Sequence, residues 1–276
     1  MNVYAEVTER IIEQMKQGQI PWQQPWVGKY SIVSHATGKP YSILNQFLLG
    51  KPGEYATFKQ IKDEGGHVKK GAKAKMVVFW KILERKNEQD EIETIPFLKH
   101  SCVFSLDDCE GVKAKYIEDE KKFDNEPIEA AQNIFESYIK RENIKLEYGE
   151  GGAFYRPSAD LINLPAFDTF ISAEAFYDTA FHEAAHSTGA SNRLNRKGIV
   201  EHHGRDEYSK EELIAEISAC SLMHMLGIET KETFRNNAAY IQNWLEALQN
   251  DVHMLVNASS AASKAVDFII GGDNNA

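Results

Sequence analysis

The segment TAFHEAAHST holds two histidines and a glutamate at a spacing that suits metal chemistry. His182 and His186 are four residues apart, so on a helix both imidazoles lie on one face and can reach a single Zn²⁺ ion. Glu183 would lie beside the open coordination position, where a carboxylate can act as a general base. The flanking residues are uncharged, which favours a helix packed inside a domain over a solvated one. This HExxH arrangement predicts a metal-dependent hydrolytic site.

A third ligand is needed, and two spacings compete for that role. The glycine of HSTG is Gly189, which puts the metzincin ligand position at Asn192, and a neutral amide is a poor zinc ligand. Downstream, SKEELIAEISACSLM predicts a helix on which Glu212 and Glu216 lie one turn apart. One of these carboxylates can bind the metal while the other hydrogen-bonds a ligand histidine. We expect two histidines and one glutamate as ligands, and we expect Glu211 to be an exposed residue of the helix start.

The composition of the whole chain excludes several classes of protein and of metal site. Three cysteines without a CxxC spacing imply neither a disulfide framework nor a cysteine-based zinc site. Histidine and carboxylate ligands accept several divalent ions, so Mn²⁺ is an alternative to Zn²⁺. With 42% hydrophobic and 26% charged residues, the 276-residue chain is globular in composition. No apolar run approaches a membrane span and the N-terminus shows no signal-peptide pattern, so we expect a cytoplasmic protein without a membrane partner.

The charge of the chain divides unevenly along its length. Residues 1–83 carry 12 Lys and Arg against 6 Asp and Glu, whereas the rest carries 19 against 35. The net charge of −10 therefore combines a basic first third with an acidic remainder, which suggests two domains with different partners. The polar stretch that contains YIEDEKKFDNEP is the best linker candidate. We predict an N-terminal domain over 1–110, a linker over 111–127 and a C-terminal domain over 128–276.

Hydrophobic periodicity predicts the elements that must position the site, in an α+β fold. The segments AKMVVFWKIL and HSCVFSL form a predicted β-hairpin, and the proline-rich stretch IPWQQPWVGKYSIVSHATGKPY is predicted to be an extended loop. Helices are expected at about 3–16, 42–49, 57–64, 128–141, 173–188, 210–226, 234–249 and 252–270, and further strands at 144–148, 153–156 and 160–164. A small sheet therefore precedes the helices of the C-terminal domain.

Two further groups of residues are candidates for binding. Single-stranded DNA needs cations along its phosphates and exposed rings for its bases, and the first third contains both. The candidates are Trp22, Trp26, Lys29, Tyr30, Lys39, Tyr41, Lys69, Lys70, Lys73 and Lys75. The alternative for the tryptophans is a place in the core. In the loop between the two metal-binding helices, His203 or Tyr208 could donate to an oxyanion, although a solvated loop is the simpler interpretation of the histidines there.

The strings FYRPSADLINLP, FHEAAHSTGASNRLNR and YSKEELIAEISA resemble the zincin-like metallopeptidase domain of ArdC-type antirestriction proteins, which bacterial conjugative plasmids and other mobile elements carry. The opening YAEVTERIIEQMKQGQIPWQQPW and the strand MVVFWK resemble the single-stranded-DNA-binding domain of the same family. The resemblance spans nearly the whole chain. In related gluzincins the third ligand begins an ExxxD or ExxAN motif, so ELIAE implies Glu212 as ligand and Glu216 as its neighbour. Glu216 departs from the Asp or Asn of that motif, which leaves the two roles open.

The resemblance implies a function for each half of the chain. The N-terminal domain would bind single-stranded DNA, and the C-terminal domain would be a zinc metallopeptidase in which Glu183 is the general base. The protein would protect incoming DNA from host restriction, and its unidentified protein substrate could be a component of the restriction system. The alternative is a non-enzymatic protein that coats single-stranded DNA and carries a structural or unused zinc site.

Overall fold

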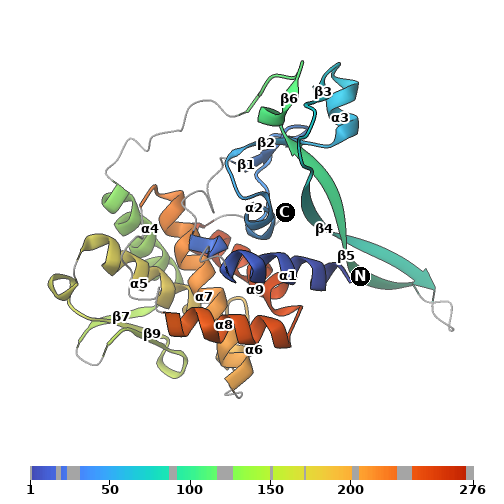
Figure 1. The fold of residues 1–276 in the computed structure, drawn as a ribbon. Helices are drawn as coiled ribbons and strands as arrows, with labels where there is room; N and C mark the ends of the chain where they lie inside the picture. The colour runs from blue at the N-terminus through green and yellow to red at the C-terminus, as the bar shows by residue number, and fades with distance from the viewer. Residues whose placement is uncertain are drawn as a thin grey trace.

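The computed structural model describes residues 2–16, 20–23, 32–86, 92–116, 127–149, 152–170, 172–200, 205–228 and 238–271. An N-terminal sheet region and a C-terminal helical region make up the molecule (Figure 1). The α-helices are α1 (Val3–Lys16), α2 (Ile43–Leu49), α3 (Phe58–Asp63), α4 (Pro127–Glu142), α5 (Ala173–Ser187), α6 (Lys197–Val200), α7 (Arg205–Met225), α8 (Ala238–Asn250) and α9 (Met254–Ile270). The strands are β1 (Ile32–Ser34), β2 (Gly53–Ala56), β3 (His67–Val68), β4 (Lys75–Lys86), β5 (Ile92–Ser105), β6 (Cys109–Glu110), β7 (Lys145–Tyr148), β8 (Phe154–Arg156) and β9 (Leu161–Leu164).

Each predicted helix has a counterpart in the structure, and local signals account for the ends of several. The side chain of Ser42 accepts from the backbone N–H of Asn45 and starts α2, and Thr57 with Gln60 forms a capping box at α3. Ser172 caps α5 in the same way. The largest difference is α7, which begins at Arg205, five residues before the predicted start.

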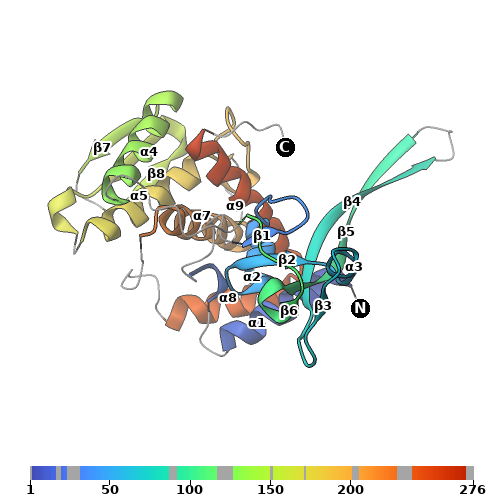
Figure 2. The same cartoon turned by 90° about the horizontal axis from the view of Figure 1, so that it is seen from above.

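The N-terminal sheet has the strand order β1-β2-β5-β4. Strand β4 pairs antiparallel with β5 over its whole length, which agrees with the predicted hairpin, and this hairpin extends well beyond the other strands (Figure 2). Strand β1 lies within the stretch that was predicted to be an extended loop, so this prediction is corrected there. The reason is that β1 has only three residues and pairs in parallel with β2, a contact that leaves no periodic pattern in so short a segment.

The C-terminal region combines the three-stranded sheet β7-β9-β8 with a layer of helices. Strand β7 runs parallel to the central strand β9 and β8 runs antiparallel to it. Helix α5 packs against β8, β9, α4 and α7, so it lies in the middle of this region. A small sheet followed by helices is the α+β arrangement that the sequence predicts.

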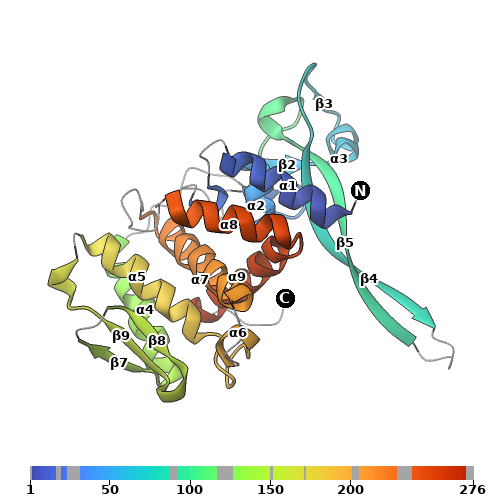
Figure 3. The ribbon, with the colours of Figure 1, turned by 60° about the horizontal axis from the view of Figure 1, so that its bottom comes forward.

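The two regions share one hydrophobic core. Helix α1 lies along α8 and α9 although more than 200 residues separate them in the chain (Figure 3). The hydroxyl of Thr8 donates to the carbonyl of Val252 at 2.8 Å, and the rings of Trp22 and Trp244 lie edge to face with 5.3 Å between their centroids. Buried side chains of α1 and α2 belong to the same cluster as those of α5, α7 and α9. Helices α1 and α2 are therefore buried in part by the C-terminal helices, while the predicted boundary at 111–127 stays a prediction.

The chain that leads toward this boundary is attached to the N-terminal sheet. The backbone N–H of Lys115 donates to Oε1 of Glu54 at 2.7 Å, and the other oxygen of Glu54 lies 2.5 Å from Nδ1 of the buried His35. Lys115 also forms an ion pair with Glu64 at 2.8 Å. These contacts hold the chain at Lys115 on the sheet. Among the described residues, no helix combines the length and the apolar character that a bilayer crossing requires.

Candidate metal centre

Helix α5 is buried along most of its length, and this explains its uncharged sequence. Ala180, Ala184 and Ala185 are fully buried, and such small side chains allow neighbouring elements to approach closely. His182 and His186 lie one turn apart on the same face, and both are buried. The Nε2 atoms of the two imidazoles lie 3.1 Å apart, so the rings converge on one point.

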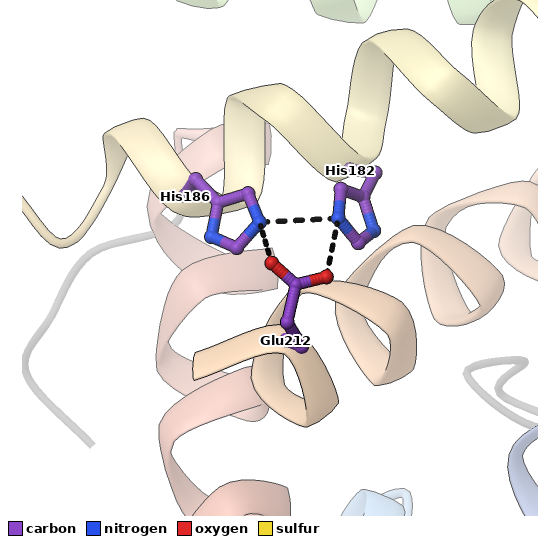
Figure 4. A group of neighbouring side chains, drawn as sticks. All are labelled: His182, His186 and Glu212. Carbon is purple, nitrogen blue, oxygen red and sulfur yellow. Dashed lines mark hydrogen bonds and ion pairs between the residues drawn. The ribbon is translucent and has the colours of Figure 1, made fainter. Parts of the chain in front are cut away.

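Helix α7 brings a carboxylate to the same point. Oε2 of Glu212 lies 3.6 Å from Nε2 of His182, and Oε1 lies 3.4 Å from Nε2 of His186 (Figure 4). Among the described residues, these three are the cluster of potential metal ligands whose donor atoms lie within 4.8 Å of one another. Asn192, the position that the metzincin spacing would use, is exposed in the turns that follow α5.

The donor atoms are spaced as a tetrahedral metal ion requires. Two ligands that each lie about 2.0 to 2.1 Å from a tetrahedral Zn²⁺ are separated by about 3.3 to 3.4 Å. The three separations of 3.1, 3.4 and 3.6 Å bracket this value. Two imidazole nitrogens and one carboxylate, all aimed at one point inside the protein, are therefore a donor set that fits a divalent cation.

A second carboxylate contacts each histidine from behind. Oε1 of Glu211 lies 3.3 Å from Nδ1 of His186, and Oε2 of Glu216 lies 3.9 Å from Nδ1 of His182. The hydrogen bond from Glu211 selects the tautomer of His186 in which Nε2 is free to bind a metal, whereas the 3.9 Å between Glu216 and His182 is longer than a hydrogen bond. The geometry thus favours Glu212 for the ligand position, and it places Glu216 behind a ligand histidine.

The expectation that Glu211 is an exposed residue of the helix start is wrong. Glu211 is buried, and it accepts two hydrogen bonds from Arg196, at 2.9 Å from Nε and 2.6 Å from Nη2. Helix α7 begins five residues earlier than predicted, so Glu211 lies inside the helix and faces the turn that contains Arg196. Gly189 leaves room for this approach, because a Cβ atom there would lie 2.7 Å from Cγ1 of Ile199 and 3.0 Å from Nη2 of Arg196. The sequence offered one signal for this contact, since Arg196, a possible counter-ion for a buried glutamate, lies ten residues after His186.

A second arginine holds the chain that follows α5 against the small sheet. The side chain of Arg193 is fully buried and pairs with both carboxylate oxygens of Asp160, at 2.8 and 2.7 Å. Asp160 lies at the turn before β9, and burial, which would raise its pKa, is outweighed by the hydrogen bonds of Arg193, which lower it. This contact fixes the C-terminal end of α5 relative to β9.

The charges of the cluster shift the pKa values of its members. Burial would lower the pKa of His186, but hydrogen bonds with Glu211 and Glu212 outweigh burial and raise it to about 9. Burial would raise the pKa of Glu212, but hydrogen bonds with His182 and His186 lower it well below the ordinary range. Glu183 is buried beside the histidines, and its charge contributes to the raised pKa of His186. The site is therefore electronegative and favours a cation.

The structure separates the candidate DNA-binding residues. The prediction for Trp22 is corrected: its ring is fully buried against Phe47 and Trp244, so it cannot stack on a base. Tyr41 is half-buried and lies edge-on to Tyr55. The exposed lysines among the candidates are Lys39, Lys69, Lys70, Lys73 and Lys75.

Five of the candidate binding residues have side chains that the structure does not describe. Trp26, Lys29, Tyr30 and His203 lie outside the described residues. Tyr208 belongs to the first turn of α7, of which only the backbone is described. Their roles in DNA binding or as oxyanion donors stay predictions.

Two family models cover most of the chain. Residues 1–104 match the N-terminal domain of anti-restriction factor ArdC, and residues 133–261 match the zincin-like metallopeptidases. A zincin-like domain implies a metal ion, and the second match contains all three clustered side chains. These matches confirm the resemblance and the α+β fold class that the sequence predicts.

Solved structures of antirestriction protein ArdC from plasmid R388 are similar over the whole chain. The metal-free structure shares 33% identity and a TM-score of 0.76, and covers 98% of this chain and 97% of its own. The Mn(II)-bound structure shares 32% identity and a TM-score of 0.78, over 100% of this chain and 99% of its own.

Curated relatives include longer proteins. Two Escherichia coli proteins named DNA primase TraC are 33% and 31% identical over 97% and 96% of this chain, which spans only 27% and 19% of their lengths. The protein y4eC of Sinorhizobium fredii (strain NBRC 101917 / NGR234) is 28% identical over 97% of this chain and 91% of its own.

Proposed function

Because this chain belongs to the family of ArdC antirestriction proteins, we propose that it binds single-stranded DNA and hydrolyses a peptide bond in a protein partner. The hydrolytic site would be the cluster of His182, His186 and Glu212, with a divalent metal ion bound between them. The observation that carries this proposal is the convergence of the three donor atoms at separations that suit a tetrahedral ion. A peptidase function also agrees with the zincin-like family of this region.

The residues of the chain divide the work of hydrolysis. When bound, a divalent ion supplies Lewis-acid chemistry, because it polarises a carbonyl group and acidifies water. Glu183 takes a proton from the attacking water and later returns it to the leaving amine, as a buried carboxylate beside the ligands can do. Glu211 holds the imidazole of His186 by its Nδ1 atom, so that Nε2 stays directed at the ion, and the charge of Glu216, 3.9 Å from Nδ1 of His182, favours the same orientation of that ring.

We expect Zn²⁺ as the native ion. Two histidines and one carboxylate with an open fourth position form the ligand set of many zinc peptidases. Mn²⁺ is the alternative, since the same donors accept it and the R388 ArdC protein has a Mn(II)-bound structure.

The DNA-binding part of the proposal depends on the N-terminal region. Residues 1–83 carry twice as many basic as acidic residues, and five of the candidate lysines are exposed. Lysines that contact phosphates release counterions from the strand, which favours binding at low salt without sequence preference. DNA binding would keep the peptidase near incoming single-stranded DNA, where it would act on a protein substrate such as a component of the restriction system.

Glu183→Gln tests the enzymatic proposal. This variant should retain the parental metal content in elemental analysis, because Glu183 is not a ligand, and it should fail to cleave fluorescein-labelled casein. Glu174→Gln, the same change in the first turn of α5, is the matched control and should leave both readouts unchanged. Cleavage at the parental rate by Glu183→Gln would contradict the proposed role of this residue.

Transfer of a plasmid into a restricting host then separates the two candidate functions. Loss of protection in Glu183→Gln would support a peptidase that acts in antirestriction. Full protection by this variant would instead favour the non-enzymatic protein that coats single-stranded DNA.

A further inference from the structure

The β4–β5 hairpin presents large apolar side chains to solvent. Its outer part reaches away from the helices, at the end of the molecule opposite to α5 (Figures 1 and 2). Phe79 is 45% exposed, and Trp80, Ile82 and Leu83 are exposed to a similar or greater degree. Four consecutive or near-consecutive exposed apolar residues on one strand are uncommon on a protein surface unless the surface binds something.

The two faces of the hairpin have different surroundings. Met76, Val78 and Leu98 point to one face and are buried in the main core. Trp80 follows on that face, and its ring lies 6.2 Å from the ring of Tyr4 in α1. The outer part of this face therefore continues a surface that packs on the body of the protein.

The opposite face carries alternating rings and ammonium groups. Phe79 pairs across the strands with Lys99, and Lys81 pairs with Phe97. Successive residues on this face are about 6.6 to 7 Å apart along a strand and about 5 Å apart across it, so the four side chains form a small checkerboard. The ammonium group of Lys99 lies 5.8 Å from the centre of the Phe97 ring. Leu83 extends the same face toward the hairpin tip.

The part of the hairpin around the checkerboard is positive: at 75–83 and 97–105 the charged side chains are three lysines, without any aspartate or glutamate. The acidic residues of the hairpin lie in its outer part, at 84–96, where the sequence has five acidic and two basic residues. Lys75 begins the same face, and the exposed Lys70 and Lys73 lie in the loop just before β4. A positive strip therefore leads from this loop onto the checkerboard.

We infer that the checkerboard of Phe79, Lys81, Phe97 and Lys99 is a binding surface for single-stranded nucleic acid, with bases on the rings and phosphates on the lysines. This inference rests on the DNA-binding part of the proposed function and identifies where the strand binds. Unpaired bases present π-faces that stack on aromatic side chains whatever the sequence, and adjacent cations neutralise the backbone. The surface takes the stacking role that the buried Trp22 cannot fill.

The residue types of the checkerboard favour a nucleic acid over a protein as the partner. Centres of protein interfaces are depleted of lysine because burying an ammonium group is costly, yet Lys81 and Lys99 lie at the centre of this surface. A nucleic acid leaves such groups hydrated and pairs them with phosphates. Duplex DNA hides its base faces in the stack, so the rings add affinity for single strands.

The test compares two double substitutions in the full chain. Phe79→Ala with Lys81→Glu changes the checkerboard, whereas Phe58→Ala with Lys62→Glu makes the same changes one turn apart on α3, where Phe58 is 59% exposed. Binding to a fluorescein-labelled oligodeoxythymidylate is measured by fluorescence polarisation over a salt series. The hairpin variant should bind at least about 5-fold more weakly, since each lost stacking partner has that effect. Its salt slope should fall by about 0.7 for each lost phosphate contact.

Phe79→Tyr and Lys81→Arg in one chain keep a ring and a cation, and this variant should bind like the parent. Lys99→Gln alone, at an exposed position, gives a second measurement should the double variant not fold. If the parent binds and the hairpin variants bind equally well, or if the α3 variant loses as much, the hairpin is not the surface and the inference fails. If the parent itself does not bind at low salt, the proposed DNA binding fails and the inference fails with it.

Discussion

Removing Arg196 and Glu211 together tests whether Glu211 acts on a metal ligand or only on stability. Arg196 donates to both oxygens of Glu211, at 2.9 and 2.6 Å, and both side chains are nearly buried. The oxygen that accepts the shorter bond also lies 3.3 Å from Nδ1 of His186. A buried ion pair is therefore connected directly to a residue that is proposed to bind the metal.

The structure sets the size of each effect. Glu211→Leu leaves the guanidinium buried without its counter-ion, and Arg196→Met leaves the carboxylate, so each should lower the free energy of unfolding by about 3 to 5 kcal/mol. The double variant should regain most of this loss, because apolar side chains can replace a buried pair. Arg196 also donates to Thr188 at 2.7 Å and to the carbonyl of Ala185 at 2.8 Å, so about 2 kcal/mol should not be regained. Affinity for Zn²⁺ should stay about 10- to 100-fold below the parent, since His186 has lost its carboxylate.

Urea unfolding of the metal-free variants gives the stabilities, and competition with a fluorescent chelator gives the affinities for Zn²⁺. The more exposed pair of Arg10 and Glu6, at 3.0 Å, is the matched control and should change stability by less than about 1 kcal/mol when replaced in the same way. A double variant with parental zinc affinity would refute the role of Glu211 in positioning His186. A double variant as unstable as the single ones would refute the ion-pair argument.

Three further outcomes follow from the site and the core. Glu212→Ala should nearly abolish zinc retention after dialysis, whereas Glu216→Ala should weaken it about 10- to 100-fold, and the reverse order would exchange their roles. In the metal-free protein the pKa of His186 is raised from 6.5 to about 9. The stabilisation that protonated His186 provides is therefore complete below pH 6.5 and is lost as the pH rises through 9. The difference in urea stability between the parent and His186→Gln should shrink over that range, and a constant difference would contradict this. Trp22→Ala should lower the free energy of unfolding by about 3 to 5 kcal/mol, and a loss below 1 kcal/mol would show that the ring is not part of the core.

Most helices and the convergence of His182 and His186 could be predicted because their signals are local. Val7, Ile11 and Met15 recur at helical spacing, and all three are buried on one face of α1. His182 and His186 converge because positions four apart on a helix share a face, whatever surrounds the helix. Strand β1 could not be found in this way, because its pairing with β2 joins short segments about twenty residues apart.

The tertiary structure decided which position each carboxylate of α7 takes in the site. The spacing of Glu211, Glu212 and Glu216 is compatible with several arrangements, and the packing of α7 against α5 directs Glu212 toward both Nε2 atoms while Glu211 turns to Arg196.

The same holds for the aromatic residues of the first third, which the sequence treats alike. Trp22 is enclosed because α8 packs over it, whereas Phe79 is exposed because β4 extends beyond the helices. The sequence by itself therefore determined the helices, the paired histidines and the family. Which carboxylate meets the histidines and which rings meet solvent depend on contacts between segments far apart in the chain, and local spacing carries no information about these.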